Sequence, residues 1–170
     1  MNERATAVFD RMDEKVICDQ PHPNFVCRLL VFGTGMKGPV SCFHIDAVAD
    51  GGGILTYKML DCEPNIFSRI ESKVDKEKLT TKDFPLSPAK LKELSEVLAE
   101  AKEYYLQNRY HSYECTPRRE HYLLEFQILG RYFYYDFEGR EPATRDAGPT
   151  KPIPLFLQKL VQFCEKITRS

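Results

Sequence analysis

Apolar and polar residues alternate along several short stretches of this chain, a period of two that is typical of β-strands with one buried face. Segments rich in glycine, proline or other turn-forming residues separate these stretches. The first three strands are therefore expected to form an antiparallel meander, and the last two a hairpin that turns at Gly130. The predicted strands are residues 25–32, 40–48, 54–60, 121–129 and 131–137.

Apolar residues spaced three and four apart predict three helices. Residues 3–16 contain a short amphipathic pattern. Ser87-Pro88 begins the clearest helix, because serine suits the N-cap and proline suits the first helical position, where an N–H would be unpaired. This helix is expected to end near Asn108. The last helix carries one apolar stripe, formed by Phe156, Leu160, Phe163 and Ile167.

Two segments lack a clear period. Within residues 61–86, NIFSRIESKV favours one or two helical turns and LTTKDFPLS favours a loop. Residues 139–152 are polar and contain glycine and proline, which predicts a long loop. The order α-β-β-β-α-β-β-α predicts an α+β fold in a single domain spanning residues 1–170. We expect a mostly antiparallel sheet of about five strands, the meander plus the hairpin, with helices packed on one face.

Charge and hydropathy exclude two classes of partner. The 24 basic and 25 acidic residues are mixed evenly along the chain, so no basic block is present to neutralise a nucleic-acid backbone. No apolar run reaches the length of about 18 residues that a membrane helix needs. The N-terminus has polar and charged residues where a secretion signal would have its apolar core, which predicts a cytoplasmic protein.

The cysteines indicate neither a metal ribbon nor a redox pair. The chain has six cysteines but no C-x-x-C spacing. A domain of this size does not need disulfides to hold its core together, so we expect reduced and mostly buried thiols. No cofactor is assigned.

Two glycine-rich segments, residues 33–38 and 50–53, invite a comparison with phosphate-binding loops. Such loops lead from a strand into the N-terminus of a helix. Both segments here connect two predicted strands, and neither has the Walker spacing. We therefore expect strand-to-strand turns and no nucleotide site.

Side-chain alternation divides the predicted sheet into an apolar face and a polar face. Two tyrosines make the polar face more than an ordinary solvated surface, since their rings are apolar and their hydroxyls form hydrogen bonds. Two interpretations stay open: this face is open to a partner, or the N-terminal helix or the 139–152 loop covers it and buries the tyrosines. The polar face comprises Cys42, His44, Asp46, Thr56, Lys58, His121, Leu123, Glu125, Gln127, Tyr132, Tyr134 and Asp136.

Cys42, His44 and Asp46 alternate on one predicted strand and could carry chemistry. A cysteine beside a histidine can act as a nucleophile, but its thiolate needs stabilisation, and the middle of a strand offers no helix N-terminus. The same residue types are zinc ligands, which His121 or Glu125 could complete if the strands pair suitably. Neither pattern forms a recognisable motif, so no catalytic or metal-binding residue is assigned.

These observations favour a non-enzymatic protein-binding domain whose partner is another protein. The outline is similar to that of bacterial immunity proteins in size, charge balance and lack of catalytic motifs, a resemblance that implies an inhibitor of a cognate protein. The alternative is a small enzyme, or a metal-binding or small-ligand-binding protein, that uses Cys42, His44 and Asp46. The sequence does not indicate an oligomeric state. The residues expected to contact the partner are His44, Asp46, Glu125, Tyr132, Tyr134 and Asp136.

Overall fold

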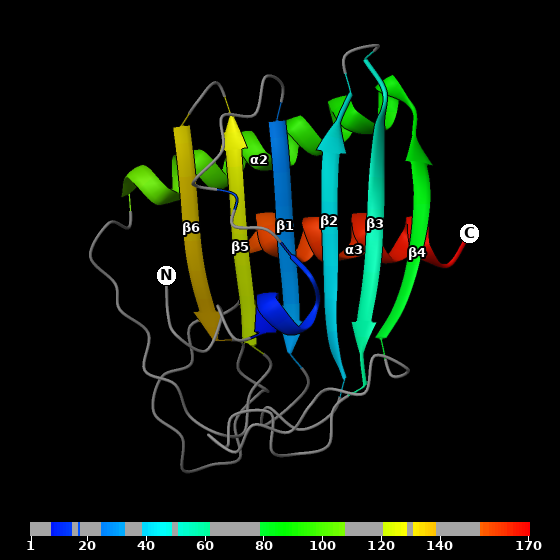
Figure 1. Ribbon diagram of the computed structural model, residues 1–170. Helices are drawn as coiled ribbons and strands as arrows, with labels where there is room; N and C mark the ends of the chain where they lie inside the picture. The colour runs from blue at the N-terminus through cyan, green and yellow to red at the C-terminus, as the bar shows by residue number, and fades with distance from the viewer. Residues whose placement is uncertain are drawn as a thin grey trace.

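A six-stranded antiparallel sheet forms the centre of the molecule (Figure 1). The computed structural model describes residues 8–14, 17, 25–32, 39–48, 51–61, 79–107, 121–128, 131–138 and 154–170. The strand order across the sheet is β4-β3-β2-β1-β5-β6, so the four N-terminal strands form a meander and β5 and β6 extend it beyond β1. The strands are β1 (Phe25–Phe32), β2 (Val40–Ala47), β3 (Gly53–Leu60), β4 (Leu79–Leu86), β5 (His121–Ile128) and β6 (Arg131–Glu138).

The predicted α+β class and antiparallel sheet are confirmed, but the sheet has six strands rather than about five. The added strand, β4, lies in the LTTKDFPLS segment for which the sequence predicts a loop. In the described structure β4 lies at the edge of the sheet and pairs only with β3. An edge strand tolerates a proline such as Pro85, and it can leave most of its side chains exposed. The alternation of apolar and polar residues along β4 is consequently too weak to predict a strand from the sequence.

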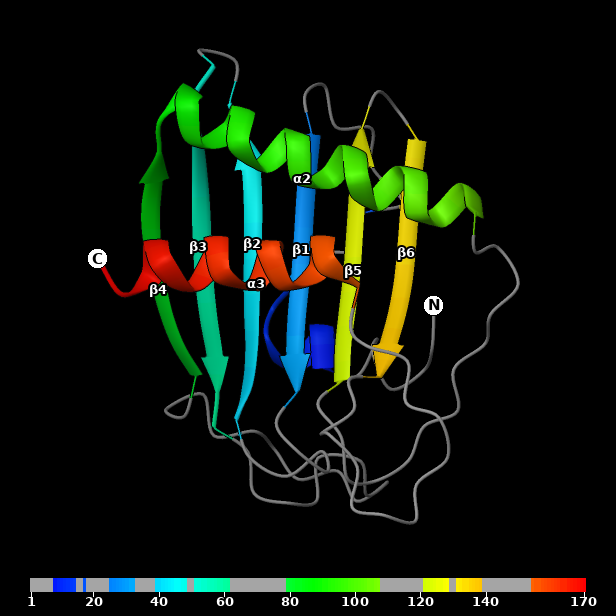
Figure 2. The ribbon, with the colours of Figure 1, turned by 180° about the vertical axis from the view of Figure 1, so that it is seen from behind.

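Two helices, α2 (Pro88–Gln107) and α3 (Leu155–Thr168), lie across the same face of the sheet (Figure 2). Both were predicted. Ser87 precedes α2, and its Oγ accepts a long hydrogen bond from the main-chain N–H of Lys90 at 3.4 Å, as expected of an N-cap. The helix α2 buries an apolar stripe formed by Leu91, Leu94, Leu98 and Ala101. The helix α3 buries Phe156, Leu160 and Phe163 of its predicted stripe, whereas Ile167 is half-buried.

The core beneath these helices is rich in aromatic rings from β5 and β6. Phe126 stacks on Phe133 with 4.8 Å between ring centroids, and Tyr135 stacks on Phe137 at 5.3 Å. The buried hydroxyl of Tyr135 donates a hydrogen bond to the main-chain oxygen of Ala101 in α2. This contact satisfies a polar group in the core and ties the helix to the sheet.

The opposite face of the sheet, which we call the second face, is covered in part by a helical turn at residues 8–11 (Figure 1). Val8, Phe9 and Met12 insert into a separate apolar cluster, while Asp10 on the same turn is exposed. Of the two interpretations of this face, the structure therefore supports cover by the N-terminal segment. Residues 3–7 of the predicted helix lie outside the described residues, as do residues 129–130 and the 139–152 loop.

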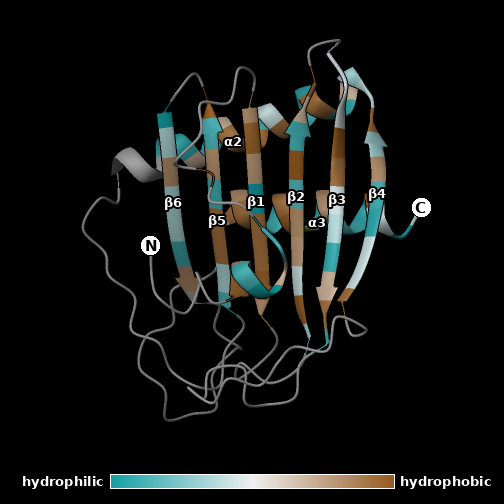
Figure 3. Cartoon of the chain, viewed as in Figure 1, coloured by the Kyte–Doolittle hydropathy of each residue, from teal (hydrophilic) through white to brown (hydrophobic). Residues whose placement is uncertain are grey.

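Hydrophobic and hydrophilic residues both occur along the strands on which the turn lies (Figure 3). The cluster that receives the turn contains Leu30, Phe32, Val40, Cys42, Leu60 and Leu123. The helices of the described residues include none that is long and apolar enough to cross a membrane.

The glycine run after β2 forms a strand-to-strand turn, as predicted. Gly51 has a φ of +85°, a conformation that side chains rarely adopt, and Val48 donates its N–H to the main-chain oxygen of Gly52 at 2.9 Å. β2 and β3 then pair in antiparallel register from Ala47 opposite Gly53. The run therefore closes a hairpin.

Candidate functional site

The chain reverses direction after the 8–11 turn and directs Glu14 back toward the sheet. Asp13 has a left-handed φ of 53°. Its N–H donates to the oxygen of Asp10 at 3.3 Å, and the N–H of Glu14 donates to the oxygen of Phe9 at 2.9 Å. This pair of hydrogen bonds is the Schellman arrangement that ends many helices, with aspartate in the position usually taken by glycine.

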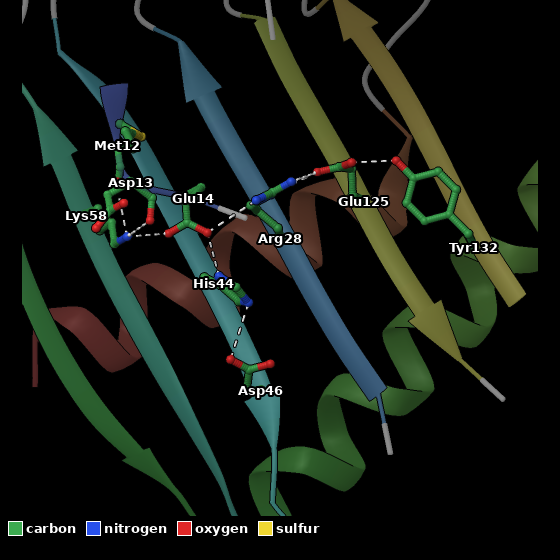
Figure 4. A network of polar contacts seen from close by, with 9 residues as sticks. All are labelled: Met12, Asp13, Glu14, Arg28, His44, Asp46, Lys58, Glu125 and Tyr132. Carbon is green, nitrogen blue, oxygen red and sulfur yellow. Dashed lines mark hydrogen bonds and ion pairs between the residues drawn. The ribbon is translucent and has the colours of Figure 1, made fainter. Parts of the chain in front are cut away.

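Three cationic side chains, each from a different strand, surround the Glu14 carboxylate (Figure 4). Nη1 of Arg28, on β1, lies 3.3 Å from Oε2 of Glu14, and Nδ1 of His44, on β2, lies 2.6 Å from the same oxygen. Lys58 of β3 places Nζ 2.7 Å from Oε1. The Lys58 ammonium also donates to the main-chain oxygens of residues 12 and 13, at 2.8 and 3.1 Å. The segment is thus held by its main chain as well as by its carboxylate.

The network continues away from Glu14 along the second face. Arg28 is fully buried and donates from Nε to Oε2 of Glu125 at 2.8 Å, and also from Nη2. Tyr132 of β6 donates its hydroxyl to the other oxygen of Glu125. The ring of Phe9 lies over the guanidinium, 3.6 Å from its carbon, in a cation–π contact. Every strand from β3 to β6 across the sheet therefore contributes to one connected set of polar contacts.

The strand register explains why these groups meet. Arg28 lies directly opposite His44 on one side and opposite Glu125 on the other. Residues paired in this way share a face of the sheet, with their side chains about 5 Å apart at the Cβ atoms. Charged groups from β1, β2 and β5 are therefore placed side by side by main-chain pairing alone.

The surroundings shift the pKa values of Glu14 and His44 in opposite directions. Burial by itself would raise the pKa of Glu14, but the hydrogen bonds and charges of His44 and Lys58 outweigh it and lower that pKa to about 2. Burial would lower the pKa of His44, but the hydrogen bonds that its ring donates to Asp46 and Glu14, together with the charges of these carboxylates, raise it to about 9. Near neutral pH, Glu14 is therefore ionised and His44 is protonated.

The charges of the network compensate one another. The cations are Arg28, Lys58 and protonated His44, and the carboxylates are Glu14, Glu125 and Asp46, whose Oδ2 lies 3.4 Å from Nε2 of His44. Three positive charges therefore face three negative ones. Because removing one member would leave a partner charge buried without compensation, the arrangement specifies the position of the N-terminal segment.

Cys42 does not join His44 in a reactive pair. Its side chain is completely buried in the apolar cluster beneath the turn. Burial, followed by the negative charge of Glu14, raises the pKa of the Cys42 thiol well above its ordinary value, which is the opposite of what a nucleophilic thiolate requires. Among the described residues, no group of three or more histidine, cysteine, aspartate or glutamate side chains is arranged to hold a metal ion.

The residues predicted to contact a partner differ in accessibility. Asp46 is the most open, with 55% of its side chain exposed, followed by Asp136 at 38%. Tyr132 and Tyr134 are half-buried. The side chain of His44 is 19% exposed and points at Glu14 and Asp46.

Glu125 differs from the rest of that predicted set because it is fully buried. Its carboxylate is engaged by Arg28 and Tyr132, so it supports the face from within and is not offered to a partner. Sequence reasoning missed the central role of Glu14 and Arg28. One signal was present: arginine is the lone charged residue in the apolar strand FVCRLLVF.

Comparisons of this chain with protein-family models, with curated proteins and with solved structures give no match.

Proposed function

We propose that this chain is a non-enzymatic protein-binding domain that uses the second face of its sheet. One observation carries the proposal: the exposed carboxylates of Asp46 and Asp136 and the half-buried Tyr132 and Tyr134 belong to the same face of the sheet, the face that also receives the N-terminal turn. Aromatic side chains with polar tips, bordered by accessible polar groups, are the usual composition of a protein interface. Asp46 lies on β2 beside His44, Tyr132 and Asp136 lie on β6, and Tyr134 of β6 packs against the apolar cluster that receives the turn.

The state of the ionisable groups favours binding over catalysis. A general base needs a pKa near the working pH, whereas the pKa of His44 is raised to about 9 by its two carboxylate neighbours. A thiol nucleophile needs access and a lowered pKa, and Cys42 has neither. The alternative of an enzyme or metal-binding protein built on Cys42, His44 and Asp46 therefore has less physical support.

The partner is expected to be another protein of the cytoplasm, and an inhibitory, immunity-type role is the finer form of the proposal. Electrostatics supports a protein partner over nucleic acid, because each cation of the described network, Arg28, His44 and Lys58, is paired with a carboxylate of the same chain.

The test is a pair of variants on the second face, Asp46→Ala and Tyr134→Ala. A partner captured by the wild-type chain from a lysate of its source would be purified, and its dissociation constant measured against each variant. Loss of an interface carboxylate or of a tyrosine anchor should weaken binding at least several-fold. Circular dichroism and thermal melting would show that each variant stays folded.

Glu96→Gln provides the matched control, because Glu96 is exposed on α2, on the opposite side of the molecule. It should leave affinity unchanged. Wild-type affinity in both second-face variants would refute the proposal for this surface. Equal weakening in the control would place the interface on the helices instead.

A further inference from the structure

We infer that residues 8–14 occupy, within their own chain, a receptor site whose proper ligand is an acidic amphipathic helix of the partner protein. This inference rests on the proposed binding function and specifies the chemistry of the partner. The structure shows the site in its closed state, with Glu14 in the position of the ligand carboxylate.

The first argument is the anion site. Its three cations come from β1, β2 and β3, whereas the carboxylate they bind comes from a segment outside the sheet. With Glu14 withdrawn, Arg28 keeps its contact with Glu125 and His44 keeps its contact with Asp46, whereas Lys58 loses the carboxylate that its ammonium binds. A ligand that restores the balance must supply an acidic group at this point.

The second argument is the apolar cluster on the second face, which lies beside the anion site. Val8, Phe9 and Met12 enter it from one side of a single turn, while Asp10 stays exposed. Apolar anchors at positions i, i+1 and i+4 are those of an amphipathic helix lying in a groove. The site therefore selects two features together: an apolar helical stripe, and a carboxylate two residues after its last anchor.

The third argument is that this segment can leave without disrupting the sheet. The main-chain hydrogen bonds recorded for its N–H groups close within the turn, as in Met12 to Val8 and Glu14 to Phe9. In the described part of the chain, it is attached to the sheet by side-chain contacts and by hydrogen bonds from the Lys58 ammonium. One helical turn is not stable in isolation, so the segment folds on the site as a ligand would.

The test uses a fluorescent peptide of residues 5–17, ATAVFDRMDEKVI, as the probe. The receptor is the full-length chain carrying Phe9→Ser and Glu14→Gln, which weakens its own segment. The peptide should bind this opened receptor saturably, one per chain, and at least ten-fold more tightly than it binds the wild type. A peptide with the same two substitutions should bind at least ten-fold more weakly, as should an opened receptor that also carries Lys58→Gln.

Absence of peptide binding to a folded, opened receptor would overturn the inference. If the opened receptor fails to fold, hydrogen exchange on the wild-type chain decides. The amides of Met12 and Glu14 should exchange by local opening, with protection at least ten-fold lower than that of Leu29 and Leu124 in the central strands. Equal protection would mean that the segment leaves only on global unfolding, and would also overturn the inference.

The two proposals fail in distinguishable ways, because the peptide assay needs no cellular partner. If a partner binds and is lost in Asp46→Ala, but the peptide does not bind, the second face is an interface and the self-occupied site is wrong. If the peptide binds but no partner is weakened by Asp46→Ala or Tyr134→Ala, the receptor site stands and the proposed partner surface is wrong.

Discussion

At the scale of single residues, Arg28 holds the second face together. Its guanidinium is completely buried, and it joins two carboxylates that come from opposite directions, Glu14 from the N-terminal segment and Glu125 from β5. The ring of Phe9 covers it from above. A planar group with five fixed donors can satisfy all these contacts at once, which a lysine in the same place could not do.

Arg28→Met should therefore destabilise the protein strongly. The substitution keeps much of the side-chain volume but leaves Glu14 and Glu125 buried without their shared cation. Breaking a buried ion pair in this way costs roughly 3–5 kcal/mol of unfolding free energy, which urea denaturation would measure. Arg131→Met, at an exposed position on β6, is the matched control and should change the unfolding free energy by less than about 0.5 kcal/mol. Equal effects from the two substitutions would contradict the central role of Arg28.

At the scale of elements, the β2–β3 hairpin sets how closely α2 approaches the sheet. A Cβ added to Gly53 would lie 2.8 Å from the main-chain oxygen of Asp46 and 3.0 Å from the side chain of Leu91 in α2. Glycine at this position therefore permits both the start of β3 and the contact with the helix. Gly51, two residues earlier, has open space around it but a positive φ.

Substitutions at the two glycines should be costly for different reasons. Gly53→Ala should lower the free energy of unfolding by about 1–3 kcal/mol, because the added methyl group forces α2 and the hairpin apart. Gly51→Ala should cost about 1 kcal/mol through backbone strain alone. Asparagine tolerates a positive φ, so Gly51→Asn should recover part of that loss whereas Gly53→Asn should not. Chemical denaturation would measure the free energy of unfolding of the four variants. If asparagine recovered stability at both positions, the steric explanation for Gly53 would be contradicted.

At the scale of the whole molecule, the charge network makes stability depend on pH in two directions. Glu14 has a folded pKa of about 2, below its ordinary 4.5, so its stabilisation is present above about 4.5 and is lost as pH falls toward 2. His44 has a folded pKa of about 9, above its ordinary 6.5, so its stabilisation is complete below 6.5 and is lost as pH rises through 9. The two contributions overlap fully between about pH 4.5 and 6.5.

The expected result is a wild-type stability maximum in that window, with a loss on the order of 1–3 kcal/mol on each side from these groups. Urea denaturation at a series of pH values would measure it. The difference between wild type and Glu14→Gln isolates the network from other ionisable groups, and this difference should shrink below pH 4.5 and above pH 6.5. A difference that stays constant from pH 3 to pH 9 would contradict the assignment.

The elements that pack on other elements could be predicted from the sequence. Five strands and α2 were predicted to within one or two residues of their ends, and α3 was predicted from its apolar stripe, because burial of one face imposes a period of two on a strand and a stripe on a helix. Assignment of His44 and Asp46 to the same face as Tyr132 and Tyr134 followed from the same alternation. The strand β4 was not predicted, because an edge strand with mostly exposed side chains has no such pattern.

The candidate site depended on the tertiary structure. Arg28 lies 14 residues from Glu14 and 97 residues from Glu125 in the chain, so no local pattern could bring the three together. Strand register places Arg28 between His44 and Glu125, and the left-handed Asp13 turns Glu14 onto them. The sequence by itself determined which residues share the second face, since side-chain alternation is a property of each strand. Only the tertiary structure decided that this face is partly covered and that the charges of the network around Glu14 and Arg28 neutralise one another, because both depend on contacts between segments far apart in the chain.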